Sequence, residues 1–581
     1  MKHKFLAIIG FSALLTLGSC GEDFLYIPPQ GSIDQEALTN EQGVELLVNN
    51  AYAVLTAKEW GASLFNWAQG GMYGGDANKG SDPGDQSVLN EMEIYNTMPT
   101  NSYLGDKWKV TYRGVRRVNL ALQVLANAED ISEAKKAIRK GELLFLRSLY
   151  YFESLKVFGS YIIYFDESEL GNDPKYHNDK DVYPNVLADI QVAIDNLPAK
   201  PEDVGRTYKW AAIALKAKIL MQQGNMAEAK PLLADLLANG QTANGKKYAL
   251  ADNMSDNWDA LKDNTSPESI FEIQFSSDAN GNANSGLALC YPHNSGPGGC
   301  CGFYQPSYEL VNSYQVDANG LPYLNNEYRT KPTVTKREDS DESISVNDPS
   351  IAVDPRLDFA VGRYDIPYKD WGYPAKDWVR NPVNGGVFLP RKHVYTKAMA
   401  DADLGRASFY DGWAPGSAMN IQYLSVRDAM LLYAECLAND GDLKGAMELV
   451  NQIRKRASLE VNVVKKEDGT PAANYKIAEY PASHAAFSDK ATCVKAIRME
   501  RKLELAMEGQ RAFDLFRWGG DYMAQELHAY VDYEKQYIPK FAGASKLSSA
   551  RTMFPIPDGE IQTMGNDESG KPYLVQPDPW K

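Results

Sequence analysis

The segment Gly70–Gln86 carries residues whose types suit hydrogen bonding to a ligand rich in hydroxyl groups. A hydroxyl group both donates and accepts a hydrogen bond, so such a ligand requires carboxylates as acceptors and carboxamides that also donate. An aromatic ring close by offers an apolar face for the C–H groups of the same ligand. A solvated turn is the alternative interpretation, because the segment is polar and rich in glycine. The candidate binding residues are Trp67, Asp76, Asn78, Asp82 and Asp85.

The same segment begins like a calcium-binding loop, with Asp76, Asn78 and Gly80 at alternate positions. Loops of that type end in a glutamate that binds the ion through both carboxylate oxygens at the twelfth position. Ser87 occupies that position here. Structural calcium is therefore the weaker interpretation, and the sequence predicts no other metal and no cofactor.

Three cysteines lie close together in a second glycine-rich segment. In an oxidising compartment their thiols are expected to form a disulfide. Cys290 could pair with Cys300 or with Cys301 as a plain loop staple, or Cys300 and Cys301 could pair with each other. We hypothesise that the last pairing forms a rigid, apolar plate that faces a sugar ring, flanked by Tyr291 and Tyr304.

A third group of aromatic and basic residues lies between residues 364 and 395. Recognition sites are often built on loops that a rigid frame supports, and aromatic rings beside an arginine suit carbohydrate binding. The candidates in this segment are Trp371, Arg391 and Tyr395.

Composition narrows the classes of function. The chain has 581 residues, with 60 Lys and Arg against 76 Asp and Glu, for a net charge of −16. Nucleic acid is a poor partner for such a chain, because phosphate binding requires clustered basic residues. The same charge favours neutral glycans over heavily sulfated ones. The sequence contains no HExxH, GxSxG or GxxxxGK[ST] motif, so we predict a noncatalytic protein. A surface glycoside hydrolase is the alternative, because that chemistry requires only two suitably placed carboxylates.

The first residues predict a lipoprotein. A basic start and an apolar run at Phe5–Leu17 precede small residues and Cys20, which together form a lipobox. The apolar run is too short to span a bilayer. Cleavage before Cys20 would remove residues 1–19 as a signal peptide and leave the lipid on Cys20. Residues 20–40 are predicted to be an extended tether, because Pro28 and Pro29 disfavour a helix there.

Two distant segments repeat one helical pattern. In residues 211–237 and again in residues 428–453, an alanine on a first helix is followed by a glycine turn and an alanine on a second helix. Small residues that face each other across a tight turn let two helices pack closely, as in tetratricopeptide units. A tetratricopeptide adaptor that binds proteins is therefore a further alternative. The paired positions are Ala217 and Ala434, Gly224 and Gly441, and Ala229 and Ala446.

The middle of the chain differs from both repeats. From about residue 251 to about residue 418, glycine, proline, asparagine and aromatic residues are frequent and long helical periodicity is absent. The sequence therefore predicts a mainly α fold in which residues 41–581 form a single domain. Its helical scaffold would comprise about 41–250 and 419–581, and about 251–418 would form a loop-rich, ligand-binding insertion.

The stretch Ile497–Gly519, IRMERKLELAMEGQRAFDLFRWG, places charges at helical spacing. Residues three and four apart share a helix face. Arg501 is therefore predicted to meet Glu504 and Glu508, and Glu508 to meet Arg511. Such a lattice of charges on an amphipathic helix is most often architecture rather than a catalytic site.

This stretch closely resembles the C-terminal signature of the SusD/RagB family, the surface glycan-binding lipoproteins of Bacteroidetes. Further segments resemble family motifs in the same order along the chain. One position departs from the pattern, because Asp428-Ala429 stands where leucine or alanine followed by glutamate is usual. The matching segments are GELLFLRSLYYFESLKVFG at 141–159, VYPNVLADIQVAIDNLP at 182–198, Asp354-Pro355-Arg356, Arg427 with Glu435, and Phe554–Ile561.

The resemblance implies a SusD-like fold, in which tetratricopeptide helices support a glycan site built from loops. It also implies a noncatalytic surface lipoprotein that captures an oligosaccharide or polysaccharide and delivers it to a SusC-like TonB-dependent transporter. The acidic residues after Cys20 resemble the family's signal for export to the outer face of the outer membrane. A lipid on Cys20 would hold the protein there.

Overall fold

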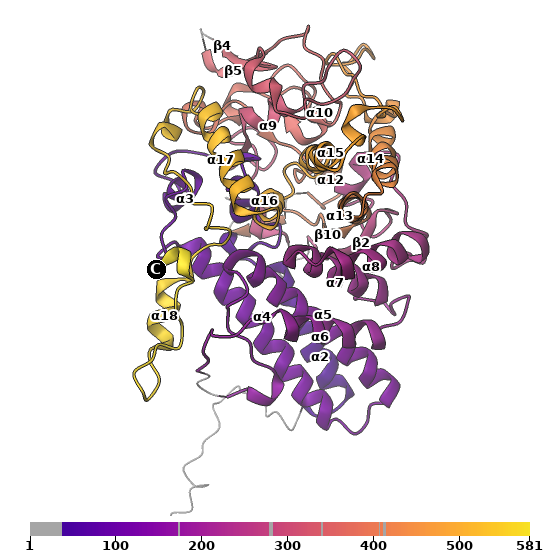
Figure 1. Cartoon of the computed structure of the whole chain (residues 1–581), viewed down its shortest axis with the longest axis vertical. Coiled ribbons are helices and arrows are strands. Elements are labelled where there is room, and N and C mark those ends of the chain that lie inside the picture. The colour runs from indigo at the N-terminus through magenta and orange to yellow at the C-terminus, as the bar shows by residue number, and fades with distance from the viewer. Residues whose placement is uncertain (1–37, 172–174, 278–282, 339–340, 406, 411–413) are drawn as a thin grey trace, which may run out of the picture.

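The computed structural model shows a mainly α protein in which long helices pack as antiparallel neighbours (Figure 1). The structure describes residues 38–171, 175–277, 283–338, 341–405, 407–410 and 414–581. The predicted signal peptide, Cys20 and nearly all of the tether lie outside these residues, so those predictions stay untested. Within the described part, no helix is long and apolar enough to cross a membrane.

The N-terminal half is a stack of helices around α5 (Glu133–Phe158), which is buried over most of its length. Every residue of α5 from Gly141 to Phe158 is buried, as expected for a helix with neighbours on all sides. Helices α4 and α6 pack on it, and α7 and α8 continue the stack. The elements are α2 (Glu41–Tyr52), α4 (Ser102–Asn127), α5 (Glu133–Phe158), α6 (Tyr183–Asn196), α7 (Lys209–Gln223) and α8 (Met226–Asn239).

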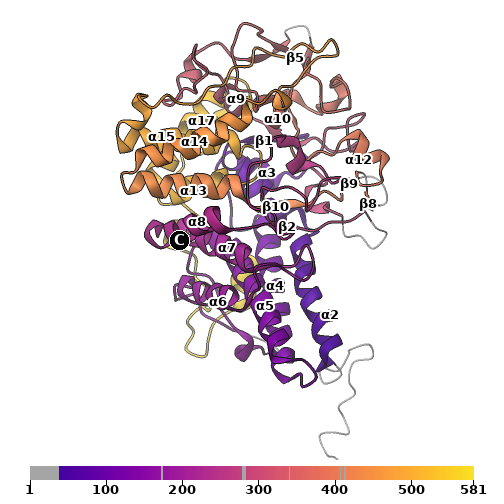
Figure 2. The ribbon, with the colours of Figure 1, turned by 90° about the vertical axis from the view of Figure 1, so that its right-hand side faces the viewer.

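The two repeated segments form helical hairpins, as predicted. Helices α7 and α8 form one, and α13 (Val426–Asn439) and α14 (Leu443–Ala457) form the other. Gly224 and Gly441 turn the chain with φ of 84° and 87°, a region that glycine enters without strain. The paired alanines of both hairpins are fully buried. Helix α13 packs on α8, so the second hairpin continues the first stack across an interval of about 190 residues (Figure 2).

Short strands and short helices fill the interval between the hairpins. Each sheet has two antiparallel strands. Strand β2 (Ser269–Ile273) pairs with β10 (Ile421–Ser425), and β1 (Ala77–Gly80) pairs with β3 (Phe303–Pro306). The other pairs are β4 (Thr335–Glu338) with β5 (Asp341–Asn347), β6 (Val361–Gly362) with β7 (Leu389–Pro390), and β8 (Ala407–Tyr410) with β9 (Ala414–Gly416).

No described helix between β2 and β10 is longer than six residues. Backbone groups in this part are therefore satisfied by turns and by side chains from distant segments rather than by long helices. The short helices are α9 (Tyr308–Ser313), α10 (Leu357–Ala360), α11 (Pro382–Gly385) and α12 (Lys397–Asp401), and α3 (Val88–Glu93) precedes them in the N-terminal half.

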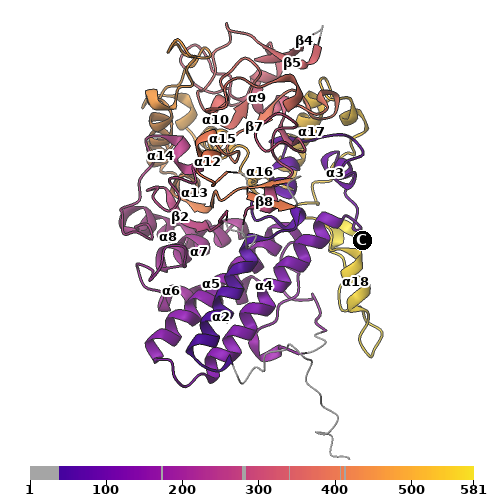
Figure 3. The same cartoon turned by 180° about the vertical axis from the view of Figure 1, so that it is seen from behind.

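The C-terminal helices return to both halves of the molecule. Helix α15 packs on α13 and α14, and α17 packs on α9. Helix α18 lies beside α4 (Figure 3), where Asp558 donates its backbone N–H to Pro99 O at 3.1 Å. The elements are α15 (Lys490–Glu504), α16 (Arg511–Arg517), α17 (Gly520–Glu534) and α18 (Asp558–Met564).

The predicted lattice of charges within one helix is wrong. Helix α15 ends at Glu504, and α16 begins only at Arg511. Between them Met507 and Gly509 have φ of 63° and 67°, which no continuous α-helix allows. The charges on either side of this turn therefore have partners elsewhere in the chain, and Glu508 does not meet Arg511.

Those partners form a buried network of ion pairs. Arg356 bonds Asp354 at 2.8 Å and Glu504 at 3.1 Å. Arg427 joins Glu508 at 3.1 Å to Glu268 at 3.0 Å. The network connects the loop-rich part to α13, α14 and α15 and is called here the closed network. Its members are Glu268, Asp354, Arg356, Lys392, Arg427, Arg454, Arg456, Glu500, Glu504 and Glu508.

Candidate functional site

Trp67 is a core residue rather than part of a ligand surface. It begins a one-turn π-helix, Trp67–Met72, and its side chain is fully buried. Its ring packs edge-on against Tyr103, Phe303 and Tyr304, and its Nε1–H donates to Trp60 O at 3.1 Å. No face of the indole is left for a sugar to stack on, which corrects the prediction from sequence.

Asp76 and Asn78 are likewise inside the protein. Asp76 Oδ2 accepts a hydrogen bond from the Met507 N–H at 3.1 Å. Asn78 donates to Glu534 Oε1 at 2.8 Å and accepts from the Tyr530 hydroxyl at 3.1 Å. These side chains fasten β1 to the C-terminal region. Because Asp76 and Asn78 are buried and bonded to protein groups, they cannot contact a glycan at the surface, which corrects the prediction from sequence. Their oxygens are also not arranged as a calcium cage.

Asp82 and Asp85 lie at the surface and share one arginine. Arg380 Nε bonds Asp82 at 2.8 Å, and its Nη1 bonds Asp85 at 2.7 Å. The side chains of Asp82 and Arg380 are 44% and 31% exposed. Lys79 supports the turn from below by donating to the carbonyl oxygens of Asp82 and Asp85. Each surface group therefore keeps lone pairs or N–H groups that a ligand can use.

The disulfide joins Cys300 to Cys301, the pairing hypothesised from sequence. Cys290 is a buried free thiol instead. Cys300 is partly exposed, so one side of the disulfide reaches the surface. Tyr291 and Tyr304 are fully buried and do not flank it at the surface. This part of the prediction fails because both rings pack inward, Tyr291 on Tyr395 and Tyr304 on Trp67.

A loop beside the disulfide is held by Asp377. The Ser295 hydroxyl donates to Asp377 Oδ1 at 2.6 Å, and Asn294 Nδ2 donates to Oδ2 at 2.6 Å. The hydrogen bonds from Ser295 hold the pKa of Asp377 below its ordinary value. Trp378 Nε1 also donates to the Ser295 hydroxyl, at 3.2 Å. The loop therefore presents an ionised carboxylate beside hydroxyl and carboxamide groups.

Three segments that are far apart in sequence thus meet at one surface. The Ser81 N–H donates to Gly302 O at 2.7 Å, immediately after the disulfide. A Cβ placed on Gly302 would stand 3.3 Å from His293 Cβ and 3.4 Å from Arg380 Cβ. We call this region the disulfide surface. Its members are Asp82, Asp85, His293, Asn294, Ser295, Cys300, Cys301, Asp377, Arg380 and Asn381.

The third predicted group divides between the core and a small cavity. Tyr395 is buried, and partly exposed Trp371 donates its Nε1–H to Tyr395 O at 2.9 Å. Arg391 is buried, and its Nη1 donates to Pro367 O at 2.7 Å. It lines a cavity of about 290 Å³ together with Trp258. That volume is at the lower limit for a small-molecule pocket.

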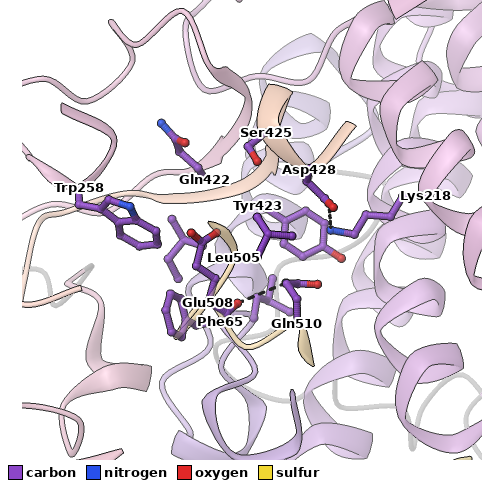
Figure 4. Close-up of a pocket in the computed structure, with 12 residues that line it drawn as sticks. Phe65, Lys218, Trp258, Gln422, Tyr423, Ser425, Asp428, Leu505, Glu508 and Gln510 are labelled. Atoms are coloured by element: carbon purple, nitrogen blue, oxygen red, sulfur yellow. Dashed lines mark hydrogen bonds and ion pairs between the residues drawn. The ribbon is translucent and has the colours of Figure 1, made fainter. Parts of the chain in front are cut away.

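The C-terminal motif borders a further pocket, shown in Figure 4. Its free volume is about 20 Å³, room for one water molecule rather than for a sugar. Lys218 bonds Asp428 at 2.7 Å, and Gln510 Nε2 donates to Glu508 O at 3.4 Å. The Tyr423 hydroxyl bonds Glu153 and the Glu508 carboxylate bonds Arg427, both outside the lining. The small volume and these internal contacts make the pocket part of the architecture.

Sequence reasoning missed Arg380 and Asp377. Neither residue belongs to a recognisable motif, and Arg380 meets Asp85 across 295 positions of the chain. The available signal was weak, namely an aspartate and an arginine on either side of Trp378 in the third predicted group. The pairing of β1 with β3 and the hydrogen bond from Ser81 to Gly302 bring the first and second predicted groups together.

Comparison with known proteins places this architecture in a family. The sequence profile described as "SusD family" matches residues 267–569, more than half of the chain. The chain belongs to the SusD family. A second profile, described as "Starch-binding associating with outer membrane", matches residues 33–221. Together the two matches extend over both the N-terminal helix stack and the C-terminal part.

Curated relatives agree with this membership. SusD-like protein P38 of Formosa agariphila is 26% identical over 536 residues, which are 89% of this chain and 92% of that protein. A SusD-like protein of Bacteroides ovatus is 25% identical over 226 residues, and the match covers 38% of this chain and 39% of that protein.

Solved structures of family members share the fold. A SusD superfamily protein from Bacteroides vulgatus has a TM-score of 0.67 and 21% identity, with 93% of this chain and 99% of that chain covered. Surface glycan-binding protein A from Bacteroides thetaiotaomicron, solved with laminarihexaose, has a TM-score of 0.59 and 20% identity, with 92% and 99% covered. At these identities the likeness concerns the fold alone.

Proposed function

We propose that this SusD-family protein binds an oligosaccharide or polysaccharide at the cell surface without altering it chemically. The observation that carries the proposal is the family match across both halves of the chain. Two structural neighbours are described as a complex with laminarihexaose and as a laminarin-binding protein. Those ligands belong to the neighbours, and they motivate a search among glycans for this chain.

We place the glycan on the disulfide surface. The Cys300–Cys301 bond would supply a rigid apolar plate against which the C–H face of a sugar ring packs. Arg380 and Asn294 would donate to ring hydroxyls, and Asp82 and Asp377 would accept from them. Three carboxylates against one arginine make this surface unfavourable for an anionic sugar. The expected ligand is therefore neutral, and an open site of this kind predicts modest affinity.

The remaining parts of the proposal concern the cell envelope. Cys20 would carry the lipid that anchors the protein to the outer membrane, and a SusC-like TonB-dependent transporter would receive the glycan. The description of the second family profile, with its reference to the outer membrane, supports this location. Replacement of Cys20 by Ala should release the protein from the membrane fraction. A transporter of that type should co-purify with the lipidated protein after mild crosslinking in native cells.

A glycan screen tests the proposal most simply. Residues 21–581 are titrated with neutral polysaccharides, acidic polysaccharides and host glycans by calorimetry, and the mixtures are analysed for reaction products. Saturable binding of a neutral glycan without products is expected. Release of shortened products would establish a glycoside hydrolase, and absence of binding to every glycan would remove the proposal.

Variants then locate the site. Arg380→Ala should weaken binding of the selected glycan at least about tenfold, because it removes charge-assisted hydrogen bonds. Replacing both Cys300 and Cys301 by Ala should do the same by removing the plate. The matched control is Arg113→Ala, since Arg113 is an exposed arginine that bonds Glu59 at 3.0 Å outside the disulfide surface. Equal binding by Arg380→Ala and by the control would exclude this site.

A further inference from the structure

A large cavity lies beside the C-terminal motif and shares no lining residue with the disulfide surface. It has a volume of about 820 Å³ and is bordered by α15, α17 and the turn at residues 324–326. Figure 1 shows α15 and α17 on neighbouring parts of the C-terminal region. Cavities of 300–1,000 Å³ are the usual size for small-molecule ligands. The space is therefore sufficient for a short oligosaccharide.

Helix α15 presents one continuous face to this cavity. The lining residues fall three and four apart along the helix, which is the spacing of a single helical face. Among them the charged side chains are all basic. Residues of α15 that line the cavity are Lys490, Ala491, Val494, Lys495, Arg498, Met499 and Lys502.

The charge of the cavity is not balanced by its own lining. Arg511, at the start of α16, adds a further cation, and Glu526 is the only carboxylate among the described lining residues. Glu526 already accepts from Asn326 at 3.3 Å and lies 3.6 Å from Arg329. Lys502 is paired with Glu309 at 3.0 Å. Among the lining residues that the structure describes, no carboxylate is therefore available to pair with Arg498 or Arg511.

Arg498 and Arg511 accordingly keep unused hydrogen-bond donors. Arg498 Nε and Arg511 Nη1 are buried atoms without a hydrogen-bond acceptor, and the whole Arg511 residue is only 8% exposed. In the described part of the chain neither guanidinium forms an ion pair within 4.0 Å. A buried cation and a buried N–H without an acceptor are both costly. The arrangement therefore points to a ligand that supplies the missing oxygens.

Aromatic rings fix the position of the two guanidinium groups. The Arg498 guanidinium lies 4.1 Å from the Tyr522 ring centre and 4.8 Å from that of Trp518. The Arg511 guanidinium lies 5.5 Å from the same Trp518 ring. Cation–π contacts hold each guanidinium in place, and the Tyr522 hydroxyl also accepts a hydrogen bond from Arg498. Arg498 Nε and Arg511 Nη1 still have no acceptor. The donors are therefore preorganised, which lowers the cost of binding an anion.

One other buried carboxylate influences Arg511. Asp76 is buried, which raises its pKa to about 6 even though the positive charge of Arg511 lowers it. Its Oδ2 accepts from the Met507 N–H rather than from the guanidinium. Asp76 therefore reduces the excess positive charge near Arg511 without satisfying the Arg511 donor.

We propose that this cavity binds an acidic sugar residue. Arg498 and Arg511 would hold its anionic group, which is either the carboxylate of a uronate or the sulfate of a sulfate ester. A guanidinium matches the planar or tetrahedral oxygens of these groups through paired N–H donors. Lys495, at the exposed edge of α15, contributes to attraction. The inference rests on the proposed function in one respect, namely that the ligand is a saccharide. The neutral glycan of the disulfide surface and this acidic residue occupy separate sites.

The test is calorimetry of residues 21–581 with digalacturonate, with a neutral disaccharide, with inorganic sulfate and with hexaglutamate. Digalacturonate should bind, more weakly as the salt concentration rises, and the neutral disaccharide should not compete with it. Arg498→Gln should raise the dissociation constant at least about tenfold. Arg113→Gln is the matched control, because Arg113 is an exposed arginine that pairs with Glu59 at 3.0 Å and does not line the cavity. It should leave the dissociation constant unchanged.

Four results would overturn the inference. They are absence of digalacturonate binding, binding that Arg498→Gln and Lys495→Gln leave unaltered, sulfate binding as tight as digalacturonate (an adventitious ion only), and preferential binding of hexaglutamate. Arg511→Gln is a further test. If Arg511→Gln does not fold, the result for Arg498→Gln decides. Binding of a neutral glycan to the same variants reports on the proposed function, so the two ideas fail independently.

Discussion

The two sides of α15 carry charges of opposite sign, and they differ in whether counter-charges from other segments meet those charges. On one side Glu500 and Glu504 belong to the closed network, in which each charge has a counter-charge from another segment. On the other side Arg498 faces a cavity, and it and Arg511 keep buried donors without acceptors. Charges in a motif are therefore architecture where counter-charges complete them, and they indicate a ligand where none is supplied.

The disulfide surface is a third case, because its ion pairs are exposed. Arg380 bonds both Asp82 and Asp85, yet water competes for all three side chains. Exposed pairs of this kind contribute little to stability, typically 0 to about 1 kcal/mol. They can be exchanged for contacts with a ligand at small cost, which the buried pairs of the closed network cannot.

The largest loss of stability is expected when a charge of the closed network is removed. Glu504→Gln leaves Arg356 and Arg456 without one of their buried counter-charges. We expect the free energy of unfolding to fall by about 3–5 kcal/mol, the usual cost of breaking a buried pair. Denaturant unfolding measures it, with Glu448→Gln as the control because Glu448 pairs with Lys444 in an exposed position. A loss equal to that of the control would contradict the role of the network.

The same variant predicts a dependence on pH. Burial alone would raise the pKa of Glu504, but Arg456 and Arg356 hold it at about 2, below the ordinary 4.5. Its ionised form therefore stabilises the fold above about pH 4.5, and that contribution is lost as pH falls toward 2. The stability difference between wild type and Glu504→Gln should shrink over this window. A difference that stays constant from pH 6 to pH 3 would show that charge is not its cause.

On the open side of α15 the expected change in stability is smaller. Arg511→Met removes a buried cation that forms no ion pair among the described residues, so little is lost and the desolvation cost is relieved. We expect the free energy of unfolding to change by at most about 1 kcal/mol in either direction. Thermal and denaturant unfolding measure this change. A loss of stability as large as that of Glu504→Gln would contradict the expectation, because it would mean that Arg511 has a structural counter-ion.

The smallest effect on stability is expected at the disulfide surface. Arg380→Ala should cost less than about 1 kcal/mol, because both of its ion pairs are exposed. Binding of the selected glycan should nonetheless fall at least about tenfold. Unfolding and calorimetry on the same preparation separate the two effects. A large loss of stability would assign Arg380 to the framework instead.

The helical scaffold could be predicted from sequence because its signals are local. Ala217 with Gly224 and Ala434 with Gly441 mark two hairpins within short windows, and both hairpins are present. The charge pairs of the motif could not be predicted in the same way. Their assumed spacing required one continuous helix, and the turn at Met507 and Gly509 interrupts it.

The candidate site was only partly visible in the sequence. The sequence offered Cys300–Cys301 as one of several possible pairings and named Asp82 and Asp85 among the candidates, and the structure places these residues at one surface. The burial of Trp67 and Tyr304 did not, because an aromatic residue beside glycine-rich segments looks the same whether it faces a ligand or the core. Contacts between residues hundreds of positions apart decide that question.

A crystal structure with the neutral oligosaccharide chosen by the glycan screen would test the central claim most directly. The account predicts a sugar ring against Cys300–Cys301, with its hydroxyl groups bonded to Arg380 and to Asp82 or Asp377. A glycan bound instead in the cavity lined by Arg391 and Trp258, or anywhere without contact to the disulfide, would contradict it.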